Sequence, residues 1–276
     1  MEDCFFFKNS TYNLFGCLHK PNKSDGQNGI GIVICSPFAE EKLRSHRIIV
    51  NFARYLADNG FTVLRFDYMG HGDSDGDFED GNIETRMSDI KCAMNTIKEK
   101  STIQKVGLFG LRLGATLAVL CEEDRVSSNF MVLWEPIVQV GNYLKQCLRS
   151  NLTTQMATYK AINYTREQMI NDLLSGHSVN VDGYLISSKF YQQGSSVDLG
   201  KMSFTYSNPV SIVHISKSDT GKAPKSIAEI YQKYSLLNSN AELKIVKERP
   251  FWNDVKAYYQ TAESLFPSTL AFLKQF

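Results

Sequence analysis

Lys105–Leu120 has the sequence KVGLFGLRLGATLAVL, and this stretch decides the fold class. The apolar run Val106–Phe109 is typical of a buried strand, and the small and apolar residues from Leu113 onward are typical of a helix. Between them is a Gly-x-x-x-Gly turn with Arg112 at its centre. A strand that turns directly into a helix is the building unit of α/β proteins, so we expect a parallel sheet flanked by helices.

The same alternation extends along the chain on both sides of this stretch. Expected strands are Ile30–Cys35, Phe61–Asp67, Val106–Phe109, Phe130–Trp134, Val210–Ile215 and Leu243–Val246, after an antiparallel opening pair at Phe5–Lys8 and Asn13–His19. Expected helices are Ser45–Asn59, Ile83–Lys100, Leu113–Cys121, a segment near Pro224–Leu236, and a closing helix that ends at Leu273 or later. The predicted sheet is therefore mostly parallel.

The strand pattern stops between about Ile137 and Tyr206. Three segments in this region are amphipathic at helical spacing: Tyr143–Leu152, Arg166–Leu174 and Gly183–Gln193. We therefore predict a helical cap over residues 137–206, inserted into a core formed by residues 1–136 and 207–276.

The composition is that of an ordinary globular protein. Of its 276 residues, 43% are hydrophobic and 21% are charged, and the net charge is +1. This charge gives no general attraction for nucleic acid. No stretch approaches the roughly 20 apolar residues of a membrane span, and Phe5–Phe7 is too short for a signal sequence. We expect a cytoplasmic protein with no membrane span and no nucleic-acid partner.

The six cysteines are scattered and form no C-x-x-C pair. Several lie within apolar patterns, so we expect buried free thiols in a reducing compartment. A zinc site would need clustered cysteines and histidines, which the sequence lacks. We therefore expect no metal site and no cofactor.

Two motifs make the chain resemble the α/β-hydrolase superfamily, in particular its serine esterases and aminopeptidase-like members. Phe66–Ser74, FDYMGHGDS, is similar to the loop after the fourth strand of these enzymes. Gly110–Gly114 lies one βα unit later, at the position of the nucleophile elbow, whose central residue is ordinarily a serine. The resemblance implies the α/β-hydrolase fold over nearly the whole chain, with a cap inserted after the sixth strand.

A narrower resemblance rests on three short segments: Ser36–Glu41, Gly110–Ala115 and Pro250–Trp252. They are similar to segments of hydrolases associated with exosortase systems, which occur with polysaccharide-export genes. This resemblance implies a role in polysaccharide or natural-product biosynthesis.

The ordinary catalytic triad, in the chain order Ser, acid, His, is incomplete. Arg112 stands where the serine belongs, and its permanently protonated guanidinium has no acceptor lone pair with which to act as a nucleophile. The base belongs after the last strand, but no histidine follows His214. Asp219 stands at the acid position that the resemblance implies. It is either a pocket carboxylate facing Arg112 or a loop residue before the next helix.

Arg112 should have an anionic partner, because a cation at the first turn of a helix is unfavourable by some tenths of a kcal/mol to about 1 kcal/mol. In one arrangement it forms an internal salt bridge that fills the site, with Asp219, Glu135 or Glu40. In the other it binds a carboxylate or phosphate of a ligand, together with backbone N–H groups near Phe38 and Leu113.

The place of the catalytic histidine is taken by Pro250–Trp252. These residues either pack the last helix against the sheet or let Trp252 form the wall of a ligand pocket with Trp134, Tyr143, Tyr184 and Tyr191. Among the histidines, His71 is expected to order its turn, His214 to be satisfied within its strand, and His46 to lie within reach of the pocket.

The sequence thus predicts a hydrolase-fold protein without nucleophile and base. It would act as a ligand-binding or accessory protein whose partner is a small anionic or acyl-containing ligand, or another protein. The alternative is a hydrolase or acyltransferase that works without the ordinary triad. In that case Arg112 holds an acidic ester substrate, and Asp219 or a glutamate of Phe38–Glu41 is the base. A third hypothesis is a structural partner protein with a filled pocket.

Overall fold

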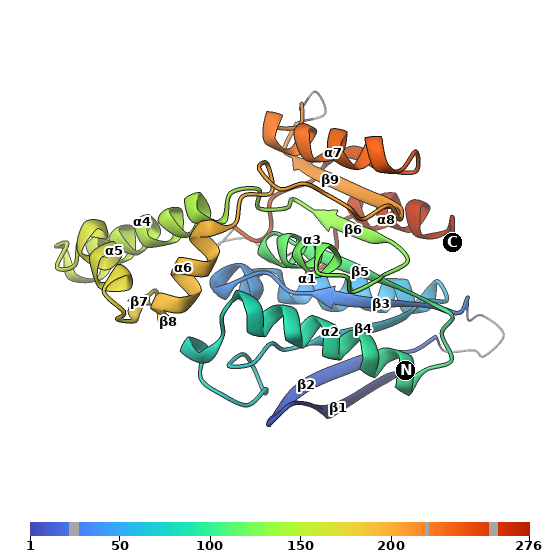
Figure 1. Ribbon diagram of the computed structural model, residues 1–276, viewed down its shortest axis with the longest axis horizontal. Coiled ribbons are helices and arrows are strands. Elements are labelled where there is room, and N and C mark those ends of the chain that lie inside the picture. Colours follow the sequence, from blue (N-terminus) through green and yellow to red (C-terminus); the bar gives the residue numbers. More distant parts are fainter. Residues whose placement is uncertain (22–27, 219–220, 254–258) are drawn as a thin grey trace.

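The computed structural model describes residues 1–21, 28–218, 221–253 and 259–276. Its centre is an eight-stranded sheet in the order β1-β2-β4-β3-β5-β6-β9-β10 (Figure 1). The strands are β1 (Glu2–Asn9), β2 (Tyr12–His19), β3 (Ile30–Cys35), β4 (Thr62–Phe66), β5 (Lys105–Leu111), β6 (Met131–Trp134), β9 (Val210–Ser216) and β10 (Glu242–Lys247). β2 pairs antiparallel with β1 and β4, and the pairings from β4 across to β10 are parallel.

Helices cover both faces of this sheet. α1 (Ala39–Asp58) and α8 (Leu265–Leu273) bury their apolar sides against one face. α2 (Ile83–Lys100), α3 (Leu113–Glu123) and α7 (Lys225–Leu237) cover the other, and a short 3-10 helix η2 (Phe78–Asp80) precedes α2. β3 is buried along its whole length because its side chains alternate between the two apolar layers, which explains its uninterrupted apolar sequence. The α/β-hydrolase architecture predicted from the sequence is confirmed.

The segment between β6 and β9 forms α4 (Val140–Tyr159), α5 (Arg166–Leu174), the hairpin β7 (Val179–Val181) and β8 (Tyr184–Ile186), and α6 (Ser188–Ser196). Figure 1 shows these elements grouped at the end of the sheet away from both chain termini. The predicted helix Gly183–Gln193 is wrong in its first part. Asp182 and Gly183 both have positive φ, 55° and 93°, and this Asp-Gly turn closes the hairpin. The helix begins only after Ser187, whose side chain accepts from the N–H of Phe190.

α1 begins at Ala39, six positions before the predicted start at Ser45. The buried face of the helix continues from Ile48 back to Ser45 and Glu41. Because Ser45 and Glu41 are polar, the apolar spacing that indicates a helix is missing in its first turns. The helix also lacks a side-chain cap at Phe38, so the usual signal for a helix start is missing. Within the described ranges, no helix combines the length and the apolar character needed to cross a membrane.

The prediction of free thiols is wrong for two cysteines. Cys4 and Cys17 stand opposite each other in the β1–β2 register and form a disulfide, with Cα atoms 4.1 Å apart. Their spacing in the sequence did not reveal this, because only the strand register brings them together. Cys35 and Cys121 are buried free thiols, while Cys92 and Cys147 are partly exposed. The prediction of a reducing compartment rested on the expectation that all six cysteines are free thiols, and the disulfide removes that support.

Candidate functional site

Arg112 lies between β5 and α3 in a strained backbone conformation. Its φ of 56° and ψ of −122° fall outside the regions that non-glycine residues ordinarily adopt. Gly110 and Gly114 permit this turn. A Cβ atom at Gly114 would lie 2.0 Å from the carbonyl oxygen of Cys35, and one at Gly110 would lie 2.4 Å from Cα of Ala115. The strand, turn and helix have the geometry of a nucleophile elbow, with an arginine in place of the serine.

The carboxylate that faces Arg112 belongs to Glu41, on the first turn of α1. Nε and one terminal nitrogen of Arg112 each lie 3.1 Å from Oε1 of Glu41, and the hydroxyl of Tyr143 donates to Oε2 at 3.1 Å. Both partners are largely enclosed, with 16% of the Arg112 side chain and 11% of the Glu41 side chain exposed. The salt bridge expected for Arg112 is therefore present.

Among the described residues, the carboxylate that pairs with Arg112 is that of Glu41, and neither Glu40 nor Glu135 pairs with it. Glu40 pairs instead with Arg44, at 3.3 Å. Glu135 binds Nδ1 of His214 at 2.9 Å, and Asp219 lies outside the described residues. The expected pairing is therefore wrong for Glu40 and Glu135, and the pairing with Asp219 stays a prediction.

Opposing effects act on the acidity of Glu41. Burial raises its pKa, while Arg112 and the hydroxyl of Tyr143 act in the opposite direction by stabilising the carboxylate. Burial is the larger effect, so the pKa of Glu41 lies above the usual value of a glutamate. The pKa of Tyr143 is also raised well above its usual value, first by burial and then by neighbouring groups that include Glu41. Tyr143 is therefore a neutral hydrogen-bond donor to Glu41.

Two aromatic rings flank the guanidinium of Arg112. Its central carbon lies 5.6 Å from the ring centroid of Tyr143 and 5.3 Å from that of Trp252, within the range of cation–π interactions. The other aromatic residues that were expected to form the wall of a ligand pocket do not all lie near Arg112. Tyr184 lines a cavity that borders Arg112, whereas Tyr191 is buried in the core. Trp134 does not line the cavity and is buried between the sheet and helices α1 and α8, where its indole N–H donates to Thr269.

The salt bridge does not fill the site. A cavity of about 250 Å³ borders Arg112, and we call it the Arg112 cavity. Its lining comes from α1, α4, the β7–β8 hairpin and three residues outside them: Phe38, Ala39, Glu40, Glu41, Arg44, Arg112, Tyr143, Gln146, Cys147, Ser150, Val181, Asp182, Tyr184, Ile186 and Asn253. The guanidinium has five N–H donors, so its bonds to Glu41 leave others for a ligand.

Three residues with strained backbone conformations lie near the carboxyl ends of the central strands. Ala39, Arg112 and Glu135 have positive φ values of 48°, 56° and 47°, although none is a glycine. They follow β3, β5 and β6, three neighbouring strands whose carboxyl ends meet here. Ligands of α/β proteins bind at the carboxyl ends of strands, and strain of this kind is typical of functional sites.

Leu113 begins α3 directly after Arg112 and is buried. Backbone N–H groups in the first turn of a helix have no acceptor within the helix, so the N–H of Leu113 is a candidate donor to a ligand oxygen. In hydrolases of this fold, the N–H after the nucleophile forms half of the oxyanion hole. Phe38, the other residue expected here, caps α1 and stacks on Phe190 at 4.7 Å.

Sequence reasoning missed the pairing of Glu135 with His214. The carboxylate of Glu135 also accepts the backbone N–H of Ile215 at 2.8 Å. Their positions at the ends of the neighbouring strands β6 and β9 were the only available signal. Neither residue lines the Arg112 cavity. In the part of the chain that the structure describes, no three His, Cys, Asp or Glu side chains are grouped so that they could hold a metal ion.

The comparisons with known proteins agree with this geometry. Residues 31–201, more than half of the chain, match the family described as serine aminopeptidase, S33. The chain therefore belongs to this family of α/β-hydrolases.

Its curated relatives include acyl transferases. The chain is 28% identical over 171 residues to an acyl transferase of Photobacterium phosphoreum, which covers 62% of this chain and 49% of the relative. It is 23% identical over 236 residues to an acyl transferase of Shewanella woodyi, covering 81% and 72%. It is 37% identical over 128 residues to protein ABHD12B of Homo sapiens, covering 45% and 33%. The match thus spans about half of the Photobacterium protein and a third of the human one.

Solved structures of esterases have the same fold. Est1E of Butyrivibrio proteoclasticus, with bound ferulic acid, superposes with a TM-score of 0.68 and 16% identity, covering 98% of each chain. The Pyrococcus furiosus esterase PF2001 gives 0.67 and 15%, covering 100% of this chain and 91% of the other. The chain is thus an α/β-hydrolase similar to esterases and acyl transferases.

Proposed function

We propose that the chain binds an anionic, acyl-bearing ligand in the Arg112 cavity and catalyses direct hydrolysis or transfer of the acyl group. Glu41 is the general base, and no acyl-enzyme forms at residue 112. The observation that carries this proposal is the position of Glu41. Its carboxylate is enclosed, has a raised pKa, borders an open cavity, and lies at the elbow of the fold.

The reaction proceeds without a covalent intermediate. A water molecule or an acceptor hydroxyl loses its proton to the Glu41 carboxylate while its oxygen attacks the acyl carbonyl carbon. The resulting oxyanion accepts a hydrogen bond from the N–H of Leu113. When the tetrahedral intermediate collapses, the bond to the leaving group breaks, and the leaving group takes the proton back from Glu41. A raised pKa suits this task because Glu41 must hold the proton while the intermediate exists.

Arg112 has two roles in this proposal. Its Nε and one terminal nitrogen fix the orientation of the Glu41 carboxylate, and its remaining donors bind the anionic group of the ligand. Residues 137–206 form the proposed cap over a core of residues 1–136 and 207–276. From this segment Tyr143 orients Glu41, and Tyr184 and Ile186 line the ligand side of the cavity.

The relatives support acyl-group chemistry, because several of them are acyl transferases. The proposed role in polysaccharide or natural-product biosynthesis rests on the narrower sequence resemblance alone and stays a prediction. So does the cytoplasmic location.

A panel of acyl esters and thioesters, with and without a carboxylate on the acyl chain, tests the proposal. We expect turnover by the parent protein, a loss of roughly 10²-fold or more in Glu41→Gln, and no labelling by a fluorophosphonate. The parent rate should rise with pH through the raised pKa of Glu41, because only the carboxylate form accepts a proton. Asp124→Asn removes a surface carboxylate and serves as the control. Fluorophosphonate labelling, or full turnover in Glu41→Gln, would refute the mechanism.

A second candidate is a ligand-binding or accessory protein without turnover. It is favoured by the fact that both oxygens of Glu41 already accept hydrogen bonds, from Arg112 and Tyr143. In that case anionic acyl compounds should raise the melting temperature of the parent protein but not that of the double variant Arg112→Met/Glu41→Gln. Turnover of any ester by Glu41 would decide against it.

A further inference from the structure

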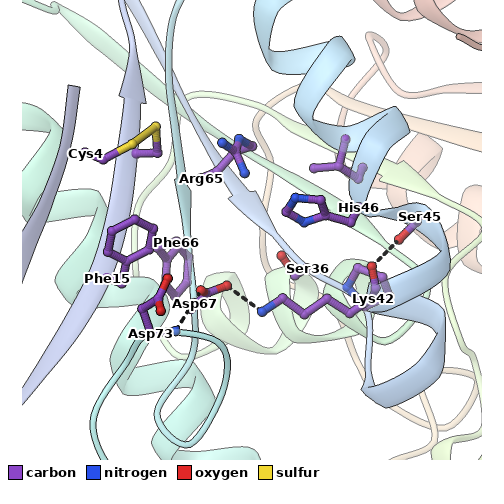
Figure 2. Close-up of a pocket in the computed structure, with 13 residues that line it drawn as sticks. Cys4, Phe15, Ser36, Lys42, Ser45, His46, Arg65, Phe66, Asp67 and Asp73 are labelled. Carbon is purple, nitrogen blue, oxygen red and sulfur yellow. Dashed lines mark hydrogen bonds and ion pairs between the residues drawn. A yellow bond between two sulfur atoms is a disulfide. The ribbon is translucent and has the colours of Figure 1, made fainter. Parts of the chain in front are cut away.

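A second cavity lies between α1 and the antiparallel side of the sheet, and we call it the Arg65 pocket. Its volume is about 250 Å³. Figure 2 draws its lining residues: Cys4, Phe15, Cys17, Ser36, Pro37, Lys42, Ser45, His46, Ile49, Arg65, Phe66, Asp67 and Asp73. None of them lines the Arg112 cavity, although both cavities border the first half of α1. The Arg65 pocket is therefore a separate site.

Arg65 brings a positive charge into this pocket from β4. Its Nε donates to Nε2 of His19 at 2.8 Å. His19 is 1% exposed, and burial, followed by the charge of Arg65, lowers the pKa of its imidazole to about 4. His19 is therefore neutral at pH 7 and accepts the hydrogen bond without balancing the charge. Among the residues that the structure describes, no carboxylate lies within 4.0 Å of the Arg65 guanidinium.

Within the described structure, Arg65 is a partly buried cation without a directly paired opposite charge. Burial lowers the pKa of Arg65, which reflects the cost of keeping the guanidinium charged there, while the charges of Glu2 and Asp67 act in the opposite direction without contacting it. Enclosed charges are ordinarily paired with an opposite charge. The terminal nitrogens of a guanidinium form a planar fork that matches a carboxylate or a phosphate. The unpaired fork indicates that the pocket accommodates an anion.

Other polar groups of the pocket lie where they could form hydrogen bonds with an anion bound to Arg65. Figure 2 shows Arg65 and His46 beside the same space, with Ser36 between His46 and the Lys42–Asp67 ion pair. In the described part of the chain, neither the Ser36 hydroxyl nor the His46 ring has a hydrogen-bond partner. The pKa of His46 is lowered by burial and by the charges of Arg65 and Lys42. At pH 7 its ring is therefore a neutral hydrogen-bonding group.

The charge balance decides which anion fits. Lys42 is neutralised by Asp67, and the carboxylate of Asp73 also lines the pocket. Once Lys42 and Asp67 cancel, one carboxylate of the described lining residues, that of Asp73, remains beside the Arg65 guanidinium. A doubly charged phosphate ester would be repelled by Asp73 more strongly than a carboxylate, which brings a single charge. Phe15, Ile49 and Phe66 supply an apolar wall. We propose that the Arg65 pocket binds a monocarboxylate that carries a short apolar chain or ring.

Hexanoate is a suitable probe, because it combines one carboxylate with a short apolar chain. Histidine ring resonances of the full chain are followed by NMR at pH 7 during titration, and His46→Gln identifies the His46 signal. We expect hexanoate to shift the His46 signal saturably. Hexanol and inorganic phosphate should bind at least 10-fold more weakly. No shift with hexanoate, equal binding of hexanol, or equal binding of phosphate would each overturn the proposal.

Two variants, Arg65→Met and Ser36→Leu, change different lining residues of the pocket and test the proposal independently. Arg65→Met removes the fork and should weaken hexanoate binding at least 10-fold, while Arg54→Met, which changes an exposed arginine of α1, should leave it unchanged. If Arg65→Met fails to fold, Ser36→Leu places an apolar side chain in the cavity and should have the same effect. The double variant Arg112→Met/Glu41→Gln should leave the His46 shift intact. Hexanoate affinity within twofold of the parent in both pocket variants, or loss of the shift in the double variant, would refute the proposal.

Discussion

Arg112 and Glu41 form an ion pair in which the burial of each side chain depends on the other. Both are largely enclosed, so removal of one partner leaves an uncompensated charge beside the cavity. We expect Arg112→Met and Glu41→Gln each to lower the free energy of unfolding, the former by up to about 3 kcal/mol. The double variant should lose less than the sum of the two. Urea unfolding of the four proteins measures this coupling, and additive losses would contradict the pairing.

His19 makes the stability of the protein depend on pH. Its pKa is lowered from 6.5 to about 4 in the folded protein. As the pH falls from about 6.5 to about 4, the unfolded chain takes up a proton that the folded chain does not, so the free energy of unfolding decreases. Above pH 6.5 both states are neutral at this residue, and it contributes nothing.

His19→Gln tests this dependence, since glutamine retains an oxygen that can accept from Arg65 but does not titrate. Each unit by which folding lowers a pKa corresponds to about 1.4 kcal/mol. We expect the stability of His19→Gln to fall less steeply than that of the parent between pH 6.5 and pH 4 in urea unfolding. Other histidines contribute to the parent slope, His71 among them, so the difference between the two proteins is the measurement. Parallel curves would show that His19 titrates normally.

At the scale of elements, the β1–β2 hairpin is held by a covalent bond in addition to its ladder. The disulfide joins residues separated by 13 positions, and closing a loop of this length restricts the unfolded chain by about 3 kcal/mol. We expect a reductant to lower the melting temperature of the parent protein. Cys4→Ser/Cys17→Ser should start from the lower value and show no response to reductant. A response of equal size in this variant would assign the effect to other cysteines.

Elements with a strong local pattern were predicted well, and contacts between elements were not. β3, α2 and α5 have the bounds that their apolar spacing predicts. Three acids were predicted as possible partners of Arg112, and one of them, Glu40, is a single position away from the observed partner, Glu41. Consecutive helical residues point in directions about 100° apart, so the partner could not be assigned while the start of α1 was unknown.

At the scale of the whole molecule, the fold could be predicted because alternating strands and helices with short connections leave few possible topologies. The elbow could be predicted because its glycines and its arginine lie within one short segment. The Arg65 pocket could not, because its lining comes from β1, β2, β4, α1 and the segments that follow β3 and β4. No spacing within one segment of the sequence encodes such a site.

The packing around the elbow also bears on how this protein can change during evolution. Close contacts at Gly110 and Gly114 fix the turn, so the backbone directs side chain 112 toward the cavity whatever that residue is. A single codon change at this position therefore replaces the chemical group presented there while the sheet and α3 keep their places. The side chain that faces the cavity can therefore change in evolution without a change of fold.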